Sequence, residues 1–516
     1  MAPPRFDVAV IGAGFGGLAA ALTLAEGGAR VLLCEALSYP GGCASTFSRR
    51  GYRFEAGATL FSGLAPDGLF GRWIQRYAPA LEVRFPDPVI ALRAPGFTLD
   101  LPPRPEDLVA QLCAMPGAPV AGIRSFFAEQ QQVAATLWGL FDDPGLLPPF
   151  REGALLDHLR RLPRYLPLLR LVGRPLVHAL RRHGVADWTP LRATLDASCQ
   201  ISVQCGVDEA EAPFAMAALD YPFRQAGHVR GGIGRLAWAL ARAVERLGGD
   251  VRMAARVRHL ARDGEGWALD VRGETVRAER VVANLLPQDL QRLAAVPPGA
   301  WPRLDRLAAQ VAEGWGAAML YLGVDSSTFD RREAHHIEII DDTSAPLIEG
   351  NHLFCSISGA DEPDRAPPGQ RTVTVSTHLS LQGCPPDQRA ARVQAVQDRM
   401  RDVLQRRAPK LWAGVRVEMP ASPRTFQRFT RRHAGLVGGI PRRAGLHHYA
   451  GLLPRPVAPG LHLVGDSVFP GQSTLAVAIG GVKVARAVLG DAALQQSLIS
   501  LPAPRPASDP APSTGR

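Results

Sequence analysis

Apolar and polar residues form alternating blocks in the N-terminal part of the chain. A short apolar run at 7–11 leads into a glycine-rich turn, and an Ala- and Leu-rich segment follows at 18–28. A second apolar run at 29–35 ends in an acid. Short apolar runs bounded by glycine are typical of buried strands, and the longer segment is typical of a helix. The pattern predicts a strand, a glycine turn, a helix and a second strand.

The glycine turn has the spacing of a dinucleotide-binding loop. Gly12 permits the tight turn, Gly14 lets the backbone approach a pyrophosphate, and Gly17 lets the helix pack close to the sheet. The helix N-terminus offers free N–H groups to phosphates. Glu35 ends the second strand, where an acid hydrogen-bonds ribose hydroxyls. These features together predict dinucleotide binding.

Three later segments extend this pattern. A glycine pair at 41–42 permits close backbone approach to a second part of an extended cofactor. A Gly-Gly turn at 231–232 precedes an amphipathic helix and a strand that we expect to end near Val257, followed by an apolar strand at 276–285. The C-terminal strand at 461–464 leads into Gly-Asp, a Pro-Gly turn and a helix.

These pieces, in this order, resemble the family of flavoprotein amine oxidases and carotenoid desaturases. The resemblance implies FAD as a non-covalent cofactor, with Asp466 on the ribityl chain and the backbone at Val257 meeting the adenine. The motifs and the resemblance together imply these cofactor-binding residues: Gly12, Gly14, Phe15, Gly16, Gly17, Glu35, Gly41, Gly42, Cys43, Ala44, Val257, Gly465, Asp466, Ser473, Thr474 and Leu475.

The fold class implied is α/β, with a discontinuous Rossmann-type FAD-binding domain and a substrate domain of antiparallel sheet plus helices. Strand-like runs at 316–325, 335–340, 352–358, 371–379 and 414–420 predict that sheet. The predicted FAD-binding segments are 1–95, 223–290 and 441–490, and the predicted substrate or lid segments are 96–222 and 291–440. A C-terminal extension, 491–516, is rich in Pro, Ala and Ser, and we expect disorder from about residue 502.

Residues 145–184 mix Leu and Val with many arginines, and prolines interrupt the run. An amphipathic segment that prolines interrupt in this way either docks on a membrane surface or covers the protein's own core as a lid. The net charge of +10 favours an anionic lipid surface. The apolar strand begins only a few residues from Met1, and no apolar run reaches the about 18 residues that span a bilayer. We therefore expect a cytoplasmic protein held peripherally at the inner face of the membrane.

Composition argues against several other classes of protein. Seven scattered cysteines without a CxxC pair argue against a disulfide framework and dithiol chemistry. Thirteen histidines show no ligand spacing, so we expect no metal site. No basic stripe with interleaved aromatic residues is present, so nucleic acid is not an expected partner.

A closer resemblance rests on the strings PGGCASTF, GYRFEAGAT and LVGDSVFPGQST. They are similar to the carotenoid C-3′,4′ desaturase branch, whose neighbours are carotene cis–trans isomerases. The resemblance implies desaturation of an acyclic carotenoid, an apolar polyene, by hydride transfer to flavin N5. No second GxGxxG is available for a nicotinamide, so quinone or O2 is the expected electron acceptor. Glu55 matches an acid common in the family, and we expect it to organise the flavin loop.

The sequence provides only weak candidates for catalysis. His228 and Arg230 precede the Gly-Gly turn at a position close to the cofactor in relatives, and Arg424 belongs to a segment that fits a substrate channel. His228 either accepts or relays a proton, as histidine side chains often do near neutral pH, or it is a hydrogen-bonded structural residue. Four alternatives to a desaturase stay open: a carotene isomerase that uses reduced FAD, a retinol-saturase-like reductase, a flavin amine oxidase, and a non-catalytic protein that escorts a lipid.

Overall fold

The computed structural model describes residues 5–57, 59–148, 150–330 and 334–490. Within them, seven strands form a first sheet in the order β10-β11-β12-β1-β2-β9, with β18 beside β12. The strands β18, β12, β1, β2 and β9 are parallel, and β10 and β11 form an antiparallel arm. Their bounds are β1 (Arg5–Ile11), β2 (Val31–Cys34), β9 (Asp250–Arg252), β10 (Val257–Asp263), β11 (Gly266–Val271), β12 (Glu274–Ala283) and β18 (Leu461–Leu463).

Helices cover both faces of this sheet because its central strands are apolar on both sides. Val8 and Val10 of β1 share a core with α1 (Phe15–Glu26), α9 (Gly234–Arg246) and α15 (Thr474–Leu489). Ala9 and Ile11 face a second core on the side of α10 (Pro287–Leu293) and α11 (Pro302–Ala312). This is the predicted Rossmann-type architecture.

A second sheet has the order β17-β13-β16-β15-β14-β6-β7 and is antiparallel except where β14 meets β6. The predicted strand runs of the second insertion are confirmed. β6, which lies within the segment 1–95, pairs with β14 of this sheet. The bounds are β6 (Ile90–Ala94), β7 (Phe97–Leu101), β13 (Trp315–Asp325), β14 (His336–Ile340), β15 (His352–Ile357), β16 (Gln370–Ser380) and β17 (Val415–Ala421).

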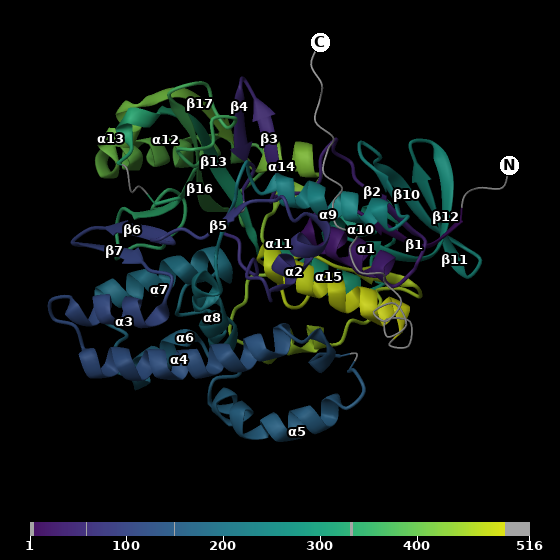
Figure 1. The fold of residues 1–516 in the computed structure, drawn as a ribbon, viewed down its shortest axis with the longest axis horizontal. Helices are drawn as coiled ribbons and strands as arrows, with labels where there is room; N and C mark the ends of the chain where they lie inside the picture. Colours follow the sequence, from purple (N-terminus) through teal and green to yellow (C-terminus); the bar gives the residue numbers. More distant parts are fainter. Residues whose placement is uncertain (1–4, 58, 149, 331–333, 491–516) are drawn as a thin grey trace, which may run out of the picture.

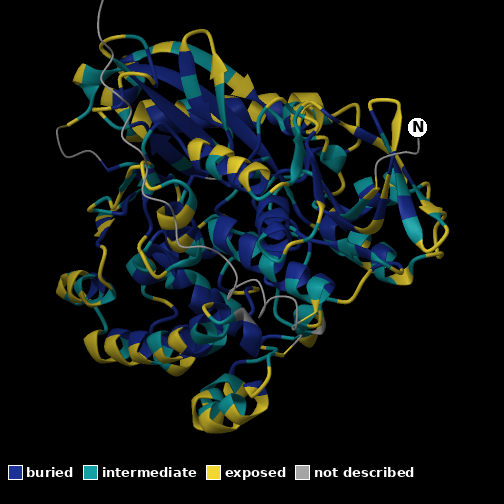
Figure 2. Ribbon diagram, turned by 45° about the vertical axis from the view of Figure 1, so that its right-hand side comes forward, coloured by how far each residue is buried: buried dark blue, intermediate teal, exposed yellow. Residues whose placement is uncertain are grey.

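A layer of helices lies below the second sheet, and α5 stands apart beneath α4 (Figure 1). In Figure 2, α5 has little cover from the rest of the chain. No helix in the described part is long and apolar enough to cross a membrane. The layer contains α3 (Pro105–Ala114), α4 (Val120–Phe141), α5 (Ala154–Tyr165), α6 (Leu176–Arg182), α7 (Thr189–Ser202) and α8 (Ala212–Leu219).

The remaining elements pack around the two sheets, and the longest of them, a helix at 389–407, covers the apolar outer face of the second sheet. They are β3 (Thr46–Arg49), β4 (Tyr52–Glu55), α2 (Leu69–Tyr77), β5 (Val83–Arg84), β8 (His228–Val229), α12 (Arg389–Arg407), α13 (Pro409–Ala413) and α14 (Pro423–Thr430), with the 3-10 segments η1 (Pro144–Leu146), η2 (Leu166–Arg170), η3 (Tyr221–Phe223), η4 (Ser326–Thr328), η5 (His433–Gly435) and η6 (Leu446–Leu452).

One predicted strand end is wrong. The strand expected to end near Val257 is shorter, because β9 ends at Arg252 and Val257 begins β10. Ala254 has a φ of +51°, a left-handed turn that interrupts the extended backbone between the two strands. The predicted disorder near the C-terminus concerns residues outside the described part of the chain.

Candidate functional site

The glycine turn between β1 and α1 brings three backbone segments into close contact. Gly12 has a φ of +96°, in the left-handed region that favours glycine. A Cβ at Gly14 would lie 2.7 Å from Asn284 Nδ2, and one at Gly17 would lie 2.0 Å from the carbonyl oxygen of Gly12. Gly14 precedes α1 and carries no capping side chain, so the first N–H groups of the helix can receive an anion.

Glu35 lies directly after β2, next to this turn, and is buried. Its carboxylate accepts hydrogen bonds from the N–H groups of Ala13 at 2.7 Å and Leu37 at 2.8 Å. Burial has the largest influence on this carboxyl and raises its pKa. Glu35 thus places a hydrogen-bond acceptor next to the loop that would bind the pyrophosphate, and this position fits the ribose hydroxyls of a dinucleotide.

The second glycine pair forms a continuous wall with the first turn. The Gly41 N–H donates to the Ala13 carbonyl at 2.8 Å, and Gly41 has a φ of +113°. A Cβ at Gly41 would lie 2.7 Å from the carbonyl oxygen of Ala44. Burial raises the pKa of the neighbouring Cys43 thiol, which therefore stays neutral. The backbone of this loop is thus open to a ligand that runs on from the first turn.

The C-terminal motif closes the same site from the other side of β12. Asp466 forms an ion pair with Arg432 at 2.7 Å. Ser473 caps α15, because its side chain accepts the Ala476 N–H at 3.0 Å. Ser473 has a φ of +95°, a conformation that non-glycine residues rarely adopt and that often marks a functional site. The N-terminus of α15 therefore points at the site in a constrained geometry.

A cavity of about 520 Å³ joins these segments. Of the predicted cofactor residues, Gly17 and Leu475 do not line it, since Gly17 packs against Gly12 and Leu475 is buried against Gly63. The predicted residues that line it are Gly12, Gly14, Phe15, Gly16, Glu35, Gly41, Gly42, Cys43, Ala44, Val257, Gly465, Asp466, Ser473 and Thr474.

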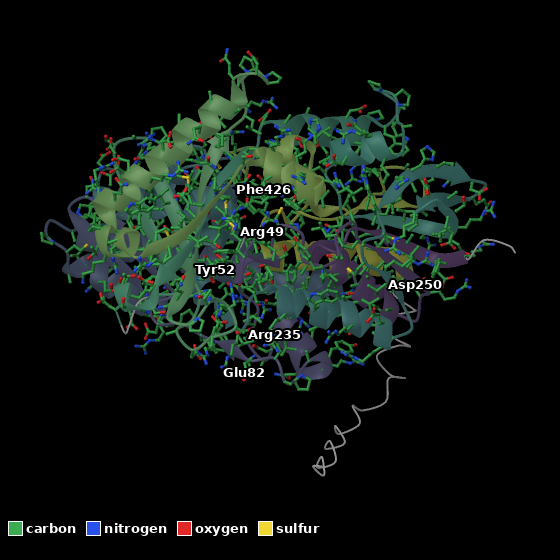
Figure 3. All side chains as sticks on the ribbon, turned by 90° about the horizontal axis from the view of Figure 1, so that it is seen from above. Arg49, Tyr52, Glu82, Arg235, Asp250 and Phe426 are labelled. Carbon is green, nitrogen blue, oxygen red and sulfur yellow. The ribbon has the colours of Figure 1, made fainter. Side chains whose placement is uncertain are left out.

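The same cavity continues between the second sheet and the helical layer. Trp138 and Phe141 of α4 and Phe214 of α8 form an apolar wall. Phe426 of α14 also lines the cavity, and Figure 3 shows it near the middle of the molecule, between the two sheets. An apolar chain and a dinucleotide can therefore share one continuous cavity.

Several polar side chains in this cavity were missed by the sequence reading. Gln204 and Gln472 each have an amide oxygen without a hydrogen-bond partner. Arg442 is buried, has no carboxylate within salt-bridge distance in the described residues, and burial lowers its pKa to about 10. His352 and His378 line the wall formed by the second sheet. Of these residues only His352 and His378 lie on strands, where the alternation of polar residues along a buried strand hinted at them.

The three catalytic candidates lie outside the cavity lining. His228 hydrogen-bonds Glu362 at 2.9 Å, and Arg230 pairs with Glu82 on the surface at 2.7 Å. Arg424 is exposed on α14. The resemblance implied a position close to the cofactor for His228, whereas in the structure β8 pairs with β5 and the His228 ring contacts Glu362. In the described residues no cluster of three or more His, Cys, Asp or Glu side chains fits a metal ion.

Glu362 makes the fold sensitive to acid. Burial opposes its ionisation, but His228, Arg365 and the Gly231 N–H outweigh burial and lower its pKa to about 2, from an ordinary 4.5. Because the pKa of Glu362 is lower in the folded than in the unfolded state, its ionisation stabilises the fold. This stabilisation is complete above about pH 4.5 and is lost as the pH falls through 2. We expect it to contribute about 3 kcal/mol to the free energy of unfolding. Urea unfolding at pH 5 and pH 3 should show a smaller acid loss for Glu362→Gln than for the natural chain, and an equal loss would contradict this.

Comparisons with known proteins agree with this geometry. The chain matches the model of the flavin-containing amine oxidoreductases over residues 15–489, and it belongs to that family. It is 27% identical to a prolycopene isomerase of Arabidopsis thaliana, over 95% of this chain and 84% of the relative. It is also 27% identical to a neurosporene-forming phytoene desaturase of Cereibacter sphaeroides, over 53% and 52%. An oxidoreductase from Methanosarcina mazei shares the fold, with a TM-score of 0.62 and 16% identity over 93% and 99%.

FAD is the cofactor of this family, and the residues present fit it. The open glycine turn suits the diphosphate, the buried Glu35 suits the adenosine ribose, and the constrained N-terminus of α15 suits the flavin ring. The unpaired oxygen of Gln472, next to Ser473, can accept a hydrogen bond from a ring N–H. Bound FAD supplies a site that accepts or returns hydride.

Glu35→Gln should weaken FAD binding about 10- to 100-fold, because a hydrogen bond to a charged group is worth about 1.5–3 kcal/mol. Flavin fluorescence titration of the apoprotein measures this. Glu279→Gln is the control, since Glu279 pairs with Arg5 on the surface and lies outside the cavity. Equal FAD affinity in the two variants would contradict the ribose assignment.

Proposed function

We propose that the protein desaturates an acyclic carotenoid, of the C-3′,4′ type, by hydride transfer to flavin N5. The observation that carries this proposal is the single cavity that runs from the dinucleotide loops to an apolar wall on α4 and α8. The names of the two carotenoid-related relatives support a polyene substrate. An acyclic polyene has few polar groups that a protein could hydrogen-bond, so an apolar wall of matching shape is the expected way to bind it.

Desaturation removes a hydride and a proton from neighbouring carbons, and the polyene spreads the charge that develops. The protein then mainly orients the chain and excludes water. Trp138, Phe141 and Phe214 serve this role in our proposal. We propose quinone or O2 as the oxidant that returns the flavin to its starting state.

Anaerobic incubation of the FAD-loaded protein with lycopene tests the proposal. The flavin and polyene absorption bands are followed together, and the mass of the product is measured by mass spectrometry. Bleaching of the flavin, a red-shifted polyene and loss of two hydrogens are the expected result. Gain of two hydrogens from pre-reduced protein would instead identify a reductase, and turnover of amines alone would identify an amine oxidase.

A carotene cis–trans isomerase is the second candidate. It is favoured by the similarity to a prolycopene isomerase over almost the whole chain. A changed polyene spectrum at unchanged mass, only after the flavin is reduced, would identify this activity and overturn the desaturase proposal.

We also propose that the protein docks on the cytoplasmic face of an anionic membrane through α5 and η2. Leu155, Leu159 and Leu162 lie on one face of α5 and are 75%, 59% and 55% exposed. Leu166 and Leu169 continue this face, and Ala154 is the buried residue of α5. Arginines between these leucines suit anionic headgroups. Phe141, the last residue of α4, lines the cavity, so the docking helix follows the apolar wall in the chain.

Co-sedimentation with vesicles of neutral or mixed neutral and anionic phospholipid tests this docking. We expect binding to the anionic vesicles that falls with salt. Replacing Leu155, Leu159 and Leu162 together by Ser should reduce it at least about tenfold, because burial of a Leu is worth about 1.5–3 kcal/mol. Serine at the exposed Leu446 and Leu453, which lie outside α5, is the control. Unchanged binding of the α5 variant would overturn the proposal.

A further inference from the structure

A buried guanidinium lies against the loop that precedes α15. Arg442 is 6% exposed, lines the cavity and contacts the end of α7, where its N–H donates to the Val203 carbonyl at 2.9 Å. Gly471 has a φ of +118°, and a Cβ at this position would lie 2.7 Å from Arg442 Nε. Only glycine therefore lets the guanidinium approach this loop so closely. The positive charge lies beside Gln472 and Ser473, which lead into α15.

The contacts of this guanidinium within the protein are few and weak. In the described residues Arg442 Nε has no hydrogen-bond partner. Nη1 donates to His448 Nδ1 at 3.2 Å, and Nη2 donates to the Val468 carbonyl at 3.4 Å, which is long for a hydrogen bond. Burial lowers the pKa of His448 to about 3, so this ring is neutral. Cζ of Arg442 lies 5.5 Å from the centre of the Phe214 ring. None of these groups carries the negative charge that would balance Arg442.

No acid in the described part of the chain forms an ion pair with Arg442. Asp466 attracts it, but this carboxylate already pairs with Arg432 at 2.7 Å. Burial raises the pKa of the Cys205 thiol to about 12, so that neighbour is neutral. Burial also lowers the pKa of Arg442 to about 10, which leaves the side chain charged at neutral pH. A buried charge without a counterion is costly, so this part of the cavity calls for a ligand that carries or acquires negative charge.

We propose that Arg442 contacts the pyrimidine ring of the flavin and stabilises the negative charge that this ring acquires on reduction. The ring presents carbonyl oxygens on both sides of one N–H. Gln472 has an unpaired amide oxygen for the N–H, and Arg442 Nε supplies a donor for a neighbouring carbonyl oxygen. The inference concerns FAD itself, so it goes beyond the proposed function and holds for a desaturase and an isomerase alike.

The consequence is a higher reduction potential of the bound flavin. A hydride brings two electrons and one proton, so a neutral flavin ring that accepts it carries one negative charge. A fixed cation in a buried site stabilises this charged form more than the neutral oxidised form. The N-terminus of α15 acts in the same direction through its partial positive charge. Charge beside the ring is one of the means by which a protein tunes a flavin, and Arg442 provides it here.

The midpoint potential of the FAD-loaded protein at pH 7, measured against a reference dye, tests the inference without any substrate. Arg442→Met should shift the two-electron equilibrium of the flavin toward the oxidised form at least about tenfold, which lowers the potential by about 30 mV. Arg442→Lys should recover most of this difference because it keeps the charge. Arg258→Met is the matched control, since the exposed Arg258 lines the same cavity next to Val257, and its potential should equal that of the natural chain.

Urea unfolding separates contact with the cofactor from a role in folding. Methionine removes a buried charge that the protein itself does not pair, so the free energy of unfolding should be kept or increased. Arg442→Gln, which is neutral but keeps a donor for the Val468 carbonyl, serves as a second neutral variant should Arg442→Met fail to fold. An unchanged potential in either FAD-loaded neutral variant, or an equal fall in Arg258→Met, would overturn the inference. A lowered potential in Arg442→Met, beside a natural chain that never removes hydrogen from lycopene, would support the inference and overturn the proposed function alone.

Discussion

We expect Gly17→Ala to weaken FAD binding by about 100-fold, or roughly 2.8 kcal/mol. The added Cβ would lie 2.0 Å from the carbonyl oxygen of Gly12 and 3.1 Å from the Asn284 side chain. A backbone carbonyl cannot rotate away as a side chain can, so α1 must move from the turn. We expect an accompanying loss of about 3 kcal/mol in the free energy of unfolding. Flavin absorbance of the purified protein, FAD titration and urea unfolding measure the two effects.

Gly139→Ala is the matched control for this substitution. Gly139 also lies within a helix, α4, but the nearest atom to its added Cβ is the flexible Arg161 guanidinium at 3.4 Å. Alanine is favoured over glycine in a helix by about 1 kcal/mol, so this variant should keep its FAD and be at least as stable. FAD affinity in Gly17→Ala equal to that in Gly139→Ala would show that α1 is not held by the Gly12 contact.

The cofactor half of the site could be predicted because its chemistry is local in sequence. Gly12, Gly14 and Glu35 lie within one strand-turn-helix-strand unit, and the backbone conformations they require leave a recognisable pattern. The Gly-Asp motif at 465–466 follows one strand and precedes one helix, so it can be read in the same way. The same spacing predicted that Gly17 lets the helix pack closely, and a Cβ at Gly17 would lie 2.0 Å from the carbonyl oxygen of Gly12.

The substrate half could not be predicted because it depends on strand register. His352 and His378 are 26 positions apart and meet only because β15 and β16 pair in one register. A shift of one residue would turn both toward the apolar core on the other face. His228 shows the converse, since its position before a Gly-Gly turn indicated the cofactor, whereas the pairing of β8 with β5 takes it to Glu362.

Arg365→Met should lower the free energy of unfolding by about 3–5 kcal/mol, because it leaves buried carboxylates without their cation. Arg365 is 2% exposed, donates to Glu55 at 3.0 Å and to the Arg53 carbonyl at 2.8 Å, and lies 4.0 Å from Glu362. Arg416→Met is the control, because the exposed Arg416 pairs with Asp325 and such pairs contribute about 0–1 kcal/mol. Urea unfolding of both variants at pH 7 gives the comparison.

Arg365→Met should also weaken FAD binding. Glu55 accepts from Thr46 Oγ1 at 2.8 Å, and Thr46 in turn accepts the Gly234 N–H at the start of α9, so this carboxylate links the loop after Ala44 to α9. Without Arg365, the buried carboxylate of Glu55 is stabilised by moving toward water, and this movement loosens the loop. FAD affinity should therefore fall in Arg365→Met and recover in part in Arg365→Met/Glu55→Gln, which removes the orphaned charge. Loss of stability without any loss of FAD affinity would show that Glu55 supports the fold but does not organise the flavin loop.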